Sequence, residues 1–143
     1  MAVKTDPFRD QHMKIMNIVD NVSRFIEDPS MVEQNALEIV KLLSDLSRSL
    51  KVHLTLEDTS LYPVVSLAEN SDLKIIAGKY KEEMGGIKDV FESYIKKWSS
   101  SYRISEGVED FVNETGALFK ALRERIERED NILYSMIDEM FKD

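Results

Sequence analysis

Hydrophobic residues recur at alternating spacings of three and four along four stretches of the chain, at about residues 6–27, 30–62, 72–98 and 106–140. This spacing places them on one face of an α-helix. Short clusters of Asp, Asn, Ser, Pro and Gly separate the stretches and indicate turns. Four amphipathic helices with three short connections pack as an antiparallel up-down-up-down bundle. We therefore predict an all-α four-helix bundle, with residues 1–143 forming a single domain.

Local signals predict where the helices begin and end. Asp6-Pro7 suits the start of the first helix, because Asp caps and Pro fits the first helical position. Ser30-Met-Val-Glu33 has the spacing of a capping box and predicts the start of the second helix. Pro63 is expected to end or kink that helix after Tyr62. Gly85-Gly86 lies inside the third stretch, where we expect close approach of a neighbouring helix, with a gap for a small ligand as the alternative.

We call the line of hydrophobic positions along one face of a helix its seam. In two of the helices polar residues continue this seam at the same helical spacing. In the second stretch His53 and Glu57 continue the seam, and in the fourth stretch Arg125 and Glu129 do the same. The two seams are Ala36, Ile39, Leu43, Leu46, Leu50, His53, Glu57, Ser60 and Val108, Phe111, Thr115, Leu118, Leu122, Arg125, Glu129, Ile132, Met136. Residues at i and i+4 share a helical face, so His53 and Glu57 are placed to act as two ligands of one metal ion.

These polar positions are expected to lie at one level of the bundle. In an antiparallel pair of helices, residues placed symmetrically about the connecting loop lie side by side. This criterion brings together His12, His53, Glu57, Met84, Arg125 and Glu129, with Tyr80 beside them. Buried charges without partners cost several kcal/mol, so such a layer inside a core calls for a functional or structural reason. A Leu-Tyr pair follows each motif, and we interpret Tyr62 and Tyr134 as packing residues with solvated hydroxyls.

Composition narrows the possible functions. The net charge of −8 disfavours nucleic acid and anionic membranes as partners. No apolar run approaches the roughly 20 residues of a membrane span, and the N-terminus lacks a signal-peptide core, so a cytoplasmic location is expected. The absence of Cys excludes disulfides, thiolate zinc sites and iron–sulfur ligation. We find no nucleophile–base pair with useful spacing, and the chain is not expected to be an enzyme.

The motifs resemble the hemerythrin-like (HHE cation-binding) family. The resemblance rests on His12, on His53-x-x-x-Glu57, and on the Arg125-x-x-x-Glu129 copy, each copy followed by Leu-Tyr. Residues 81–98 are similar to a bacterial branch of that family. The resemblance implies a four-helix bundle that holds two irons through histidines and bridging carboxylates. Members of the family bind or sense dioxygen, or handle nitric oxide and iron.

Transferred residue by residue, the resemblance implies four candidate metal ligands, His12, His53, Glu57 and Glu129. Met84 and Arg125 occupy positions where the family has histidines, so the resemblance also implies a degenerate di-iron site.

Two alternatives follow. In the first, the domain is a small sensory, regulatory or binding module rather than an oxygen carrier, is metal-free, and uses Arg125 to bridge Glu57 and Glu129. In the second, the four candidate ligands hold one or two iron ions, or another divalent metal, and the domain binds or senses dioxygen, nitric oxide or iron. The sequence identifies no protein partner.

Overall fold

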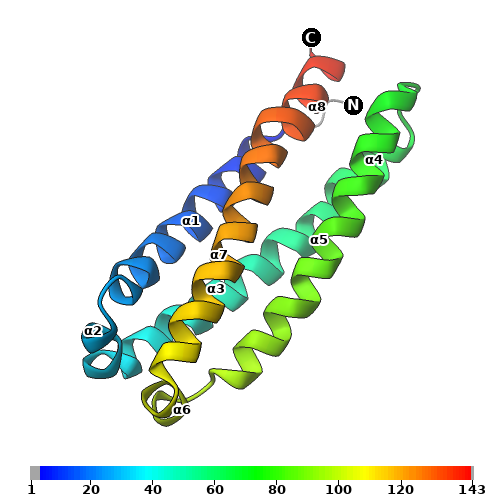
Figure 1. Cartoon of the computed structure of the whole chain (residues 1–143). Helices are drawn as coiled ribbons and strands as arrows, with labels where there is room; N and C mark the ends of the chain where they lie inside the picture. Colours follow the sequence, from blue (N-terminus) through cyan, green and yellow to red (C-terminus); the bar gives the residue numbers. More distant parts are fainter. Residues whose placement is uncertain (1–3, 143) are drawn as a thin grey trace.

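The computed structural model describes residues 4–142; residue 143 and residues 1–3, part of the N-terminal stretch considered above for a signal peptide, lie outside it. Four long helices run alternately up and down (Figure 1). They are α1 (Asp6–Ile26), α3 (Ala36–Leu56), α5 (Ser71–Lys97) and α7 (Val108–Arg128). Six short segments extend or connect them, namely α2 (Pro29–Gln34), η1 (Glu57–Leu61), α4 (Tyr62–Ser66), α6 (Ser101–Glu106), η2 (Glu129–Leu133) and α8 (Tyr134–Met140). The predicted all-α bundle is confirmed.

The helix boundaries differ from the expected ones at three points. α1 begins at Asp6, with Thr5 at the N-cap position, so the prediction that Asp6 caps this helix was wrong by one residue. Asp28, not Ser30, caps α2, because its Oδ1 accepts the Ser30 backbone N–H at 3.1 Å. The capping-box prediction was therefore wrong by two residues. Pro63 lies in the first turn of α4, where its missing N–H costs no helical hydrogen bond. The helix consequently continues past Pro63 to Ser66.

Two short π-helices, η1 and η2, follow the polar pairs and change the phase of the seams. Each π turn accommodates one extra residue. The predicted seam positions Ser60 and Ile132 are therefore exposed, and Leu61 and Leu133 are buried instead. The same shift turns Tyr62 and Tyr134 into the interior. The two π-helices thus decide which residues border the polar layer.

Two apolar clusters pack on either side of this polar layer. The larger one joins α1, α3, α5 and α7 toward the α2 and α6 end, and it includes Phe111 and Phe119. Within this cluster, a buried hydrogen bond of 2.6 Å between the Tyr94 and Thr115 hydroxyls connects α5 to α7. The smaller cluster lies at the end formed by α4 and α8 and includes Leu61 and Leu133. The polar groups are therefore shielded from solvent at both ends.

The glycine pair of α5 does not mark close helix packing. A Cβ at Gly85 or Gly86 would meet no atom within 4 Å, so that prediction was wrong. Gly86 lines a largely apolar cavity of about 930 Å³ between α5 and α7. Gly85 lines a smaller one of about 180 Å³, which also reaches Glu57 and Met84. The alternative, a gap beside these glycines, agrees with the structure.

No helix within residues 4–142 has both the length and the apolar character to cross a membrane.

Candidate metal centre

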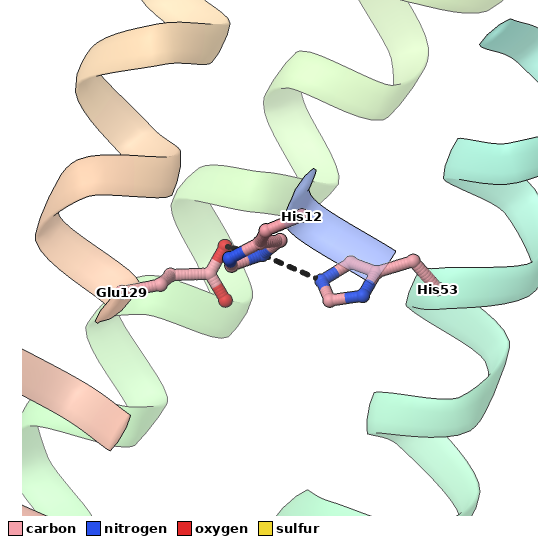
Figure 2. Close-up of side chains that lie close together, drawn as sticks. All are labelled: His12, His53 and Glu129. Atoms are coloured by element: carbon pink, nitrogen blue, oxygen red, sulfur yellow. Dashed lines mark hydrogen bonds and ion pairs between the residues drawn. The ribbon is translucent and has the colours of Figure 1, made fainter. Parts of the chain in front are cut away.

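Three buried side chains from three helical segments converge in the polar layer (Figure 2). His12 comes from α1, His53 from α3 and Glu129 from η2, and one donor atom of each lies within 4.8 Å of the others. The two Nε2 atoms are 2.9 Å apart, and His12 Nε2 lies 3.8 Å from Glu129 Oε1. Glu57 Oε1 is 3.2 Å from His53 Nε2. The structure therefore brings together all four residues predicted as ligands.

The outer nitrogens of both histidines have acceptors as partners. His12 Nδ1 lies 2.8 Å from the carboxylate Oδ1 of Asp130, and His53 Nδ1 lies 2.7 Å from the amide Oε1 of Gln11. When both imidazoles are neutral, each Nδ1 therefore carries the proton, and the Nε2 lone pairs are directed at each other. Metal-binding histidines show this arrangement, in which the outer N–H is held and the inner nitrogen is free.

The two carboxylates bring more negative charge into the layer than hydrogen bonds can offset. Within residues 4–142, Glu57 Oε1 and Glu129 Oε1 are both buried and have no hydrogen-bond partner. Burial and the neighbouring Glu57 raise the pKa of Glu129 well above its usual value. For Glu57, burial raises the pKa, but the nearby His53 Nε2, 3.2 Å from Glu57 Oε1, stabilises the carboxylate when that imidazole is protonated and lowers the pKa. Without a cation, the pair therefore keeps its proton on Glu129. Burial likewise lowers the pKa of His12, which favours the neutral imidazole.

Tyr134 is a part of the site that the sequence interpretation missed. Its hydroxyl is not solvated as expected but is buried and donates to Glu57 Oε2 at 2.7 Å. Its ring stacks on the His12 imidazole, with centroids 5.3 Å apart and planes at 19°. The repeated Leu-Tyr pair after each motif was the available sequence signal, and its meaning depended on the π-helix before it.

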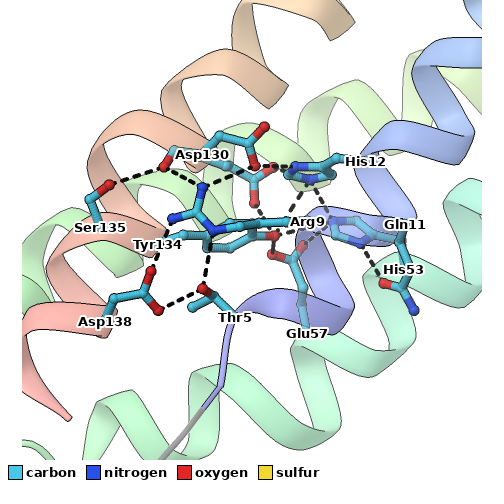
Figure 3. A network of polar contacts seen from close by, with 11 residues as sticks. Thr5, Arg9, Gln11, His12, His53, Glu57, Asp130, Tyr134, Ser135 and Asp138 are labelled. Atoms are coloured by element: carbon cyan, nitrogen blue, oxygen red, sulfur yellow. Dashed lines mark hydrogen bonds and ion pairs between the residues drawn. The ribbon is translucent and has the colours of Figure 1, made fainter. Parts of the chain in front are cut away.

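An outer network holds Asp130 in place (Figure 3). The Arg9 guanidinium donates to the Asp130 backbone oxygen at 3.0 Å and to Asp138 Oδ2 at 3.1 Å. The Thr5 hydroxyl donates to Asp138 Oδ1 at 2.6 Å. These bonds tie the start of α1 to η2 and α8, and so fix the segment that orients His12.

Arg125 and Met84 lie in the neighbouring part of the layer. The Arg125 guanidinium forms an ion pair with Glu83 of α5 and lies over the Tyr80 ring, 5.4 Å from its centroid. No hydrogen bond or ion pair within residues 4–142 joins it to Glu57 or Glu129, so the predicted arginine bridge was wrong. The Met84 side chain is buried, with 3 % exposure. Both side chains fill space beside the donor cluster without completing it.

Comparison with known families gives a clear assignment. Residues 3–137 match the family described as Hemerythrin HHE cation binding domain. The match covers most of the 143 residues, and the chain belongs to this family. Searches of curated proteins and of solved structures gave no match.

The donor set fits one metal ion better than two. Two imidazole nitrogens and two carboxylates suit iron, zinc or manganese. Beside them lie Met84, whose thioether is a poor ligand for such ions, and Arg125, whose guanidinium has no lone pair to offer. The residues present therefore fit the cation expected of the family at a single position.

The first motif copy offers a matched comparison for Tyr134. The Tyr62 hydroxyl is buried but has no hydrogen-bond partner in the part of the chain that the structure describes. Tyr62→Phe removes a polar group that gains nothing from the folded state, so we expect unfolding free energy to stay constant or rise by up to about 1 kcal/mol. Urea denaturation followed by circular dichroism measures it. A loss above about 1 kcal/mol would show that this hydroxyl has a stabilising role.

Proposed function

We propose that the domain binds one divalent metal ion, with iron as the first candidate, through His12, His53, Glu57 and Glu129. The proposal rests chiefly on the two Nε2 atoms, which face each other at 2.9 Å while both Nδ1 protons are engaged outward. Two bare lone pairs at this distance repel unless a cation lies against them. A metal ion would satisfy both nitrogens and the two partnerless carboxylate oxygens together.

A metal-free network explains the geometry less well. It requires one of the two imidazoles to carry a proton on both ring nitrogens, so that its Nε2 donates a hydrogen bond to the Nε2 of the other. Burial lowers the pKa of His12 and opposes that proton. A proton on His53 Nε2 would lie 3.2 Å from Glu57 Oε1, but the network would still leave Glu129 Oε1 without a partner, at a cost of about 1–3 kcal/mol. The contacts of Arg125 with Glu83 and Tyr80 remove the cation that the network was expected to use.

The role we propose is that of a small sensory or binding module rather than an oxygen carrier or an enzyme. Bound iron would supply a redox-active ion with coordination positions open to dioxygen or nitric oxide. The cavity beside Gly85 reaches Glu57 and gives a diatomic ligand a route to the layer. His12 and His53 would hold the ion on one side, Glu57 and Glu129 would balance its charge, and the apolar clusters would exclude bulk water.

Metal stoichiometry tests the proposal. Metal-depleted protein is titrated anaerobically with Fe(II), and separately with Zn(II), and analysed by calorimetry and elemental analysis. We expect one ion per chain, and at least about 100-fold weaker binding for His53→Gln, since removing a ligand should exceed the 10–100-fold effect of removing an outer partner. Glu114→Gln, which changes an exposed carboxylate paired with Lys97, is the control and should bind normally. No binding of either metal to folded protein would overturn the proposal.

A second test concerns Asp130, which holds the His12 Nδ1 proton. Asp130→Ala is expected to weaken metal binding by about 10–100-fold, because the imidazole loses its fixed tautomer and orientation. Competition with a chromophoric chelator measures the change. The control is Asp58→Ala, the equivalent position of the first motif copy, whose side chain is exposed. Equal effects in the two variants would mean that general surface charge, not imidazole orientation, is responsible.

A further inference from the structure

The Tyr134 hydroxyl oxygen lies close to all four proposed ligands. It is 2.7 Å from Glu57 Oε2, and 3.4 Å from each of His12 Nε2, His53 Nε2 and Glu129 Oε2. One strong hydrogen bond to Glu57 explains the first distance. It does not explain why the oxygen is equally far from the two imidazole nitrogens.

The two nitrogens and the phenol oxygen form a nearly equilateral triangle, with edges of 2.9, 3.4 and 3.4 Å. The point equidistant from the three atoms lies about 1.9 Å from each, close to the roughly 2.0–2.2 Å of metal–nitrogen and metal–oxygen bonds. The three atoms thus already have the spacing of neighbouring ligands around one ion.

We propose that Tyr134 is a ligand of the bound metal, through its phenolate oxygen, and that it shifts the preference of the site from Fe(II) toward Fe(III). This inference rests on the proposed metal site and adds its fifth ligand. As the oxygen–metal bond forms, the phenol gives its proton to solvent, in the way that metal binding displaces protons from other ligands.

Charge balance in the buried layer supports a trivalent ion. The Glu57 and Glu129 carboxylates carry two negative charges, and the Tyr134 phenolate adds a third, while both imidazoles are neutral. Fe(III) neutralises this set, and a divalent ion leaves one negative charge in a site with almost no solvent exposure. Uncompensated buried charge is costly. The phenolate therefore shifts the preference of the site toward the oxidised ion.

The π-helix η2 explains why a tyrosine reaches this position. Tyr134 follows Glu129 by five residues, a separation that places two side chains on one face of a π turn. Tyr62 stands in the same relation to Glu57 after η1, but no hydrogen bond to its hydroxyl is formed. The two copies of the motif therefore give one tyrosine aimed at the donors and one matched tyrosine that is not.

Spectroscopy of the iron-loaded protein tests the inference. Metal-depleted protein is mixed with Fe(III) supplied as its nitrilotriacetate complex, and visible absorption and resonance Raman spectra are recorded. We expect a phenolate-to-iron charge-transfer band with enhanced tyrosine ring modes. Tyr134→Phe should lose both, and Tyr62→Phe should keep both. Stoichiometric iron in the unmodified protein without the band, or a band that survives Tyr134→Phe, would overturn the inference while the metal site itself stands.

Affinity for the two oxidation states gives an independent readout. In Tyr134→Phe we expect Fe(III) affinity to fall by at least about 100-fold while Fe(II) affinity changes by less than about 10-fold, so that the midpoint potential rises. Calorimetry and potentiometric titration measure these changes. Equal losses for both ions would mean that Tyr134 only positions Glu57 through its hydrogen bond, and would overturn the ligand assignment. A Tyr134→Phe protein that unfolds is replaced by Tyr134→His, which supplies a neutral donor, and the same shift toward Fe(II) is expected.

Discussion

Glu129→Gln is expected to stabilise the metal-free protein by about 1–2 kcal/mol while removing most of its metal affinity. Glu129 is fully buried, and no described residue forms a hydrogen bond with its Oε1. Burial and the nearby Glu57 raise its pKa, so the folded metal-free protein must hold a proton there or a second negative charge in one pocket. The Gln amide has nearly the same shape and no charge, so the metal-free protein needs neither a proton nor a second negative charge at this position.

The same substitution should remove the ligand that completes the cluster. An amide oxygen carries no charge, so a bound cation loses the attraction of one carboxylate in a site shielded from solvent. Urea denaturation of chelator-treated protein measures stability, and anaerobic Fe(II) titration measures affinity. In the control Glu114→Gln, a carboxylate that accepts from Lys97 and Trp98 is lost, so stability should fall rather than rise. A metal-free Glu129→Gln protein that is less stable than the unmodified protein would contradict the prediction.

If Glu129→Gln raises the stability of the metal-free protein and lowers its metal affinity, the polar layer serves a function rather than the stability of the fold. A purely structural network would lose stability when one of its members is removed. A metal site without its ion is instead a source of strain that ion binding relieves. The partnerless Oε1 atoms of Glu57 and Glu129 indicate the second situation.

The fold and the burial of the four candidate ligands were predictable from hydrophobic periodicity. The seams continue through His53 and Glu57, and through Glu129, in phase with buried leucines, so burial of these side chains followed from helix geometry alone. The symmetry of antiparallel helices then placed His12 at the same level. Both steps depend only on the helical repeat and the loop positions, which the sequence specifies well.

The residues beyond the π-helices were not predictable in the same way. Extrapolating the seam by three or four residues gave Ser60 and Ile132, whereas the extra residue in each π turn buries Leu61 and Leu133. A π turn is a local change of hydrogen bonding that periodicity does not encode. The role of Tyr134 depends on that change and was missed for this reason.

The ion-pair partner of Arg125 was not predictable from the sequence. The sequence placed it one turn from Glu129 on the same helix, and a bridge to that carboxylate was one possible outcome. In the structure its long side chain instead reaches Glu83 on α5, whose side chain is 45 % exposed, and the Tyr80 ring lies beneath the guanidinium. Partial exposure lowers the cost of keeping a permanent charge, and periodicity does not distinguish between two such carboxylates.

The double substitution Met84→His with Arg125→His is expected to raise metal binding from one ion to two ions per chain. Both positions adjoin the donor cluster, and their side chains are 3 % and 11 % exposed. The change removes a thioether and a permanent cation and supplies two imidazoles, the ligand type that iron and zinc accept. Glu83 loses its partner, but it is 45 % exposed and tolerates the loss, since such pairs contribute about 0–1 kcal/mol.

Control variants distinguish the effect of adding two imidazole ligands from the effect of removing the Met84 and Arg125 side chains. Met84→Leu with Arg125→Ala clears the same positions without new donors and should still bind one ion. Each single histidine variant should also bind one ion, because a second ion needs both. Elemental analysis after anaerobic Fe(II) loading gives the stoichiometry. If the folded double-histidine variant still binds one ion, then Met84 and Arg125 are not what limits the site to a single metal. The limit would then lie in the spacing of α5 and α7, which the Lys97–Glu114 pair and the Tyr94–Thr115 hydrogen bond help to fix.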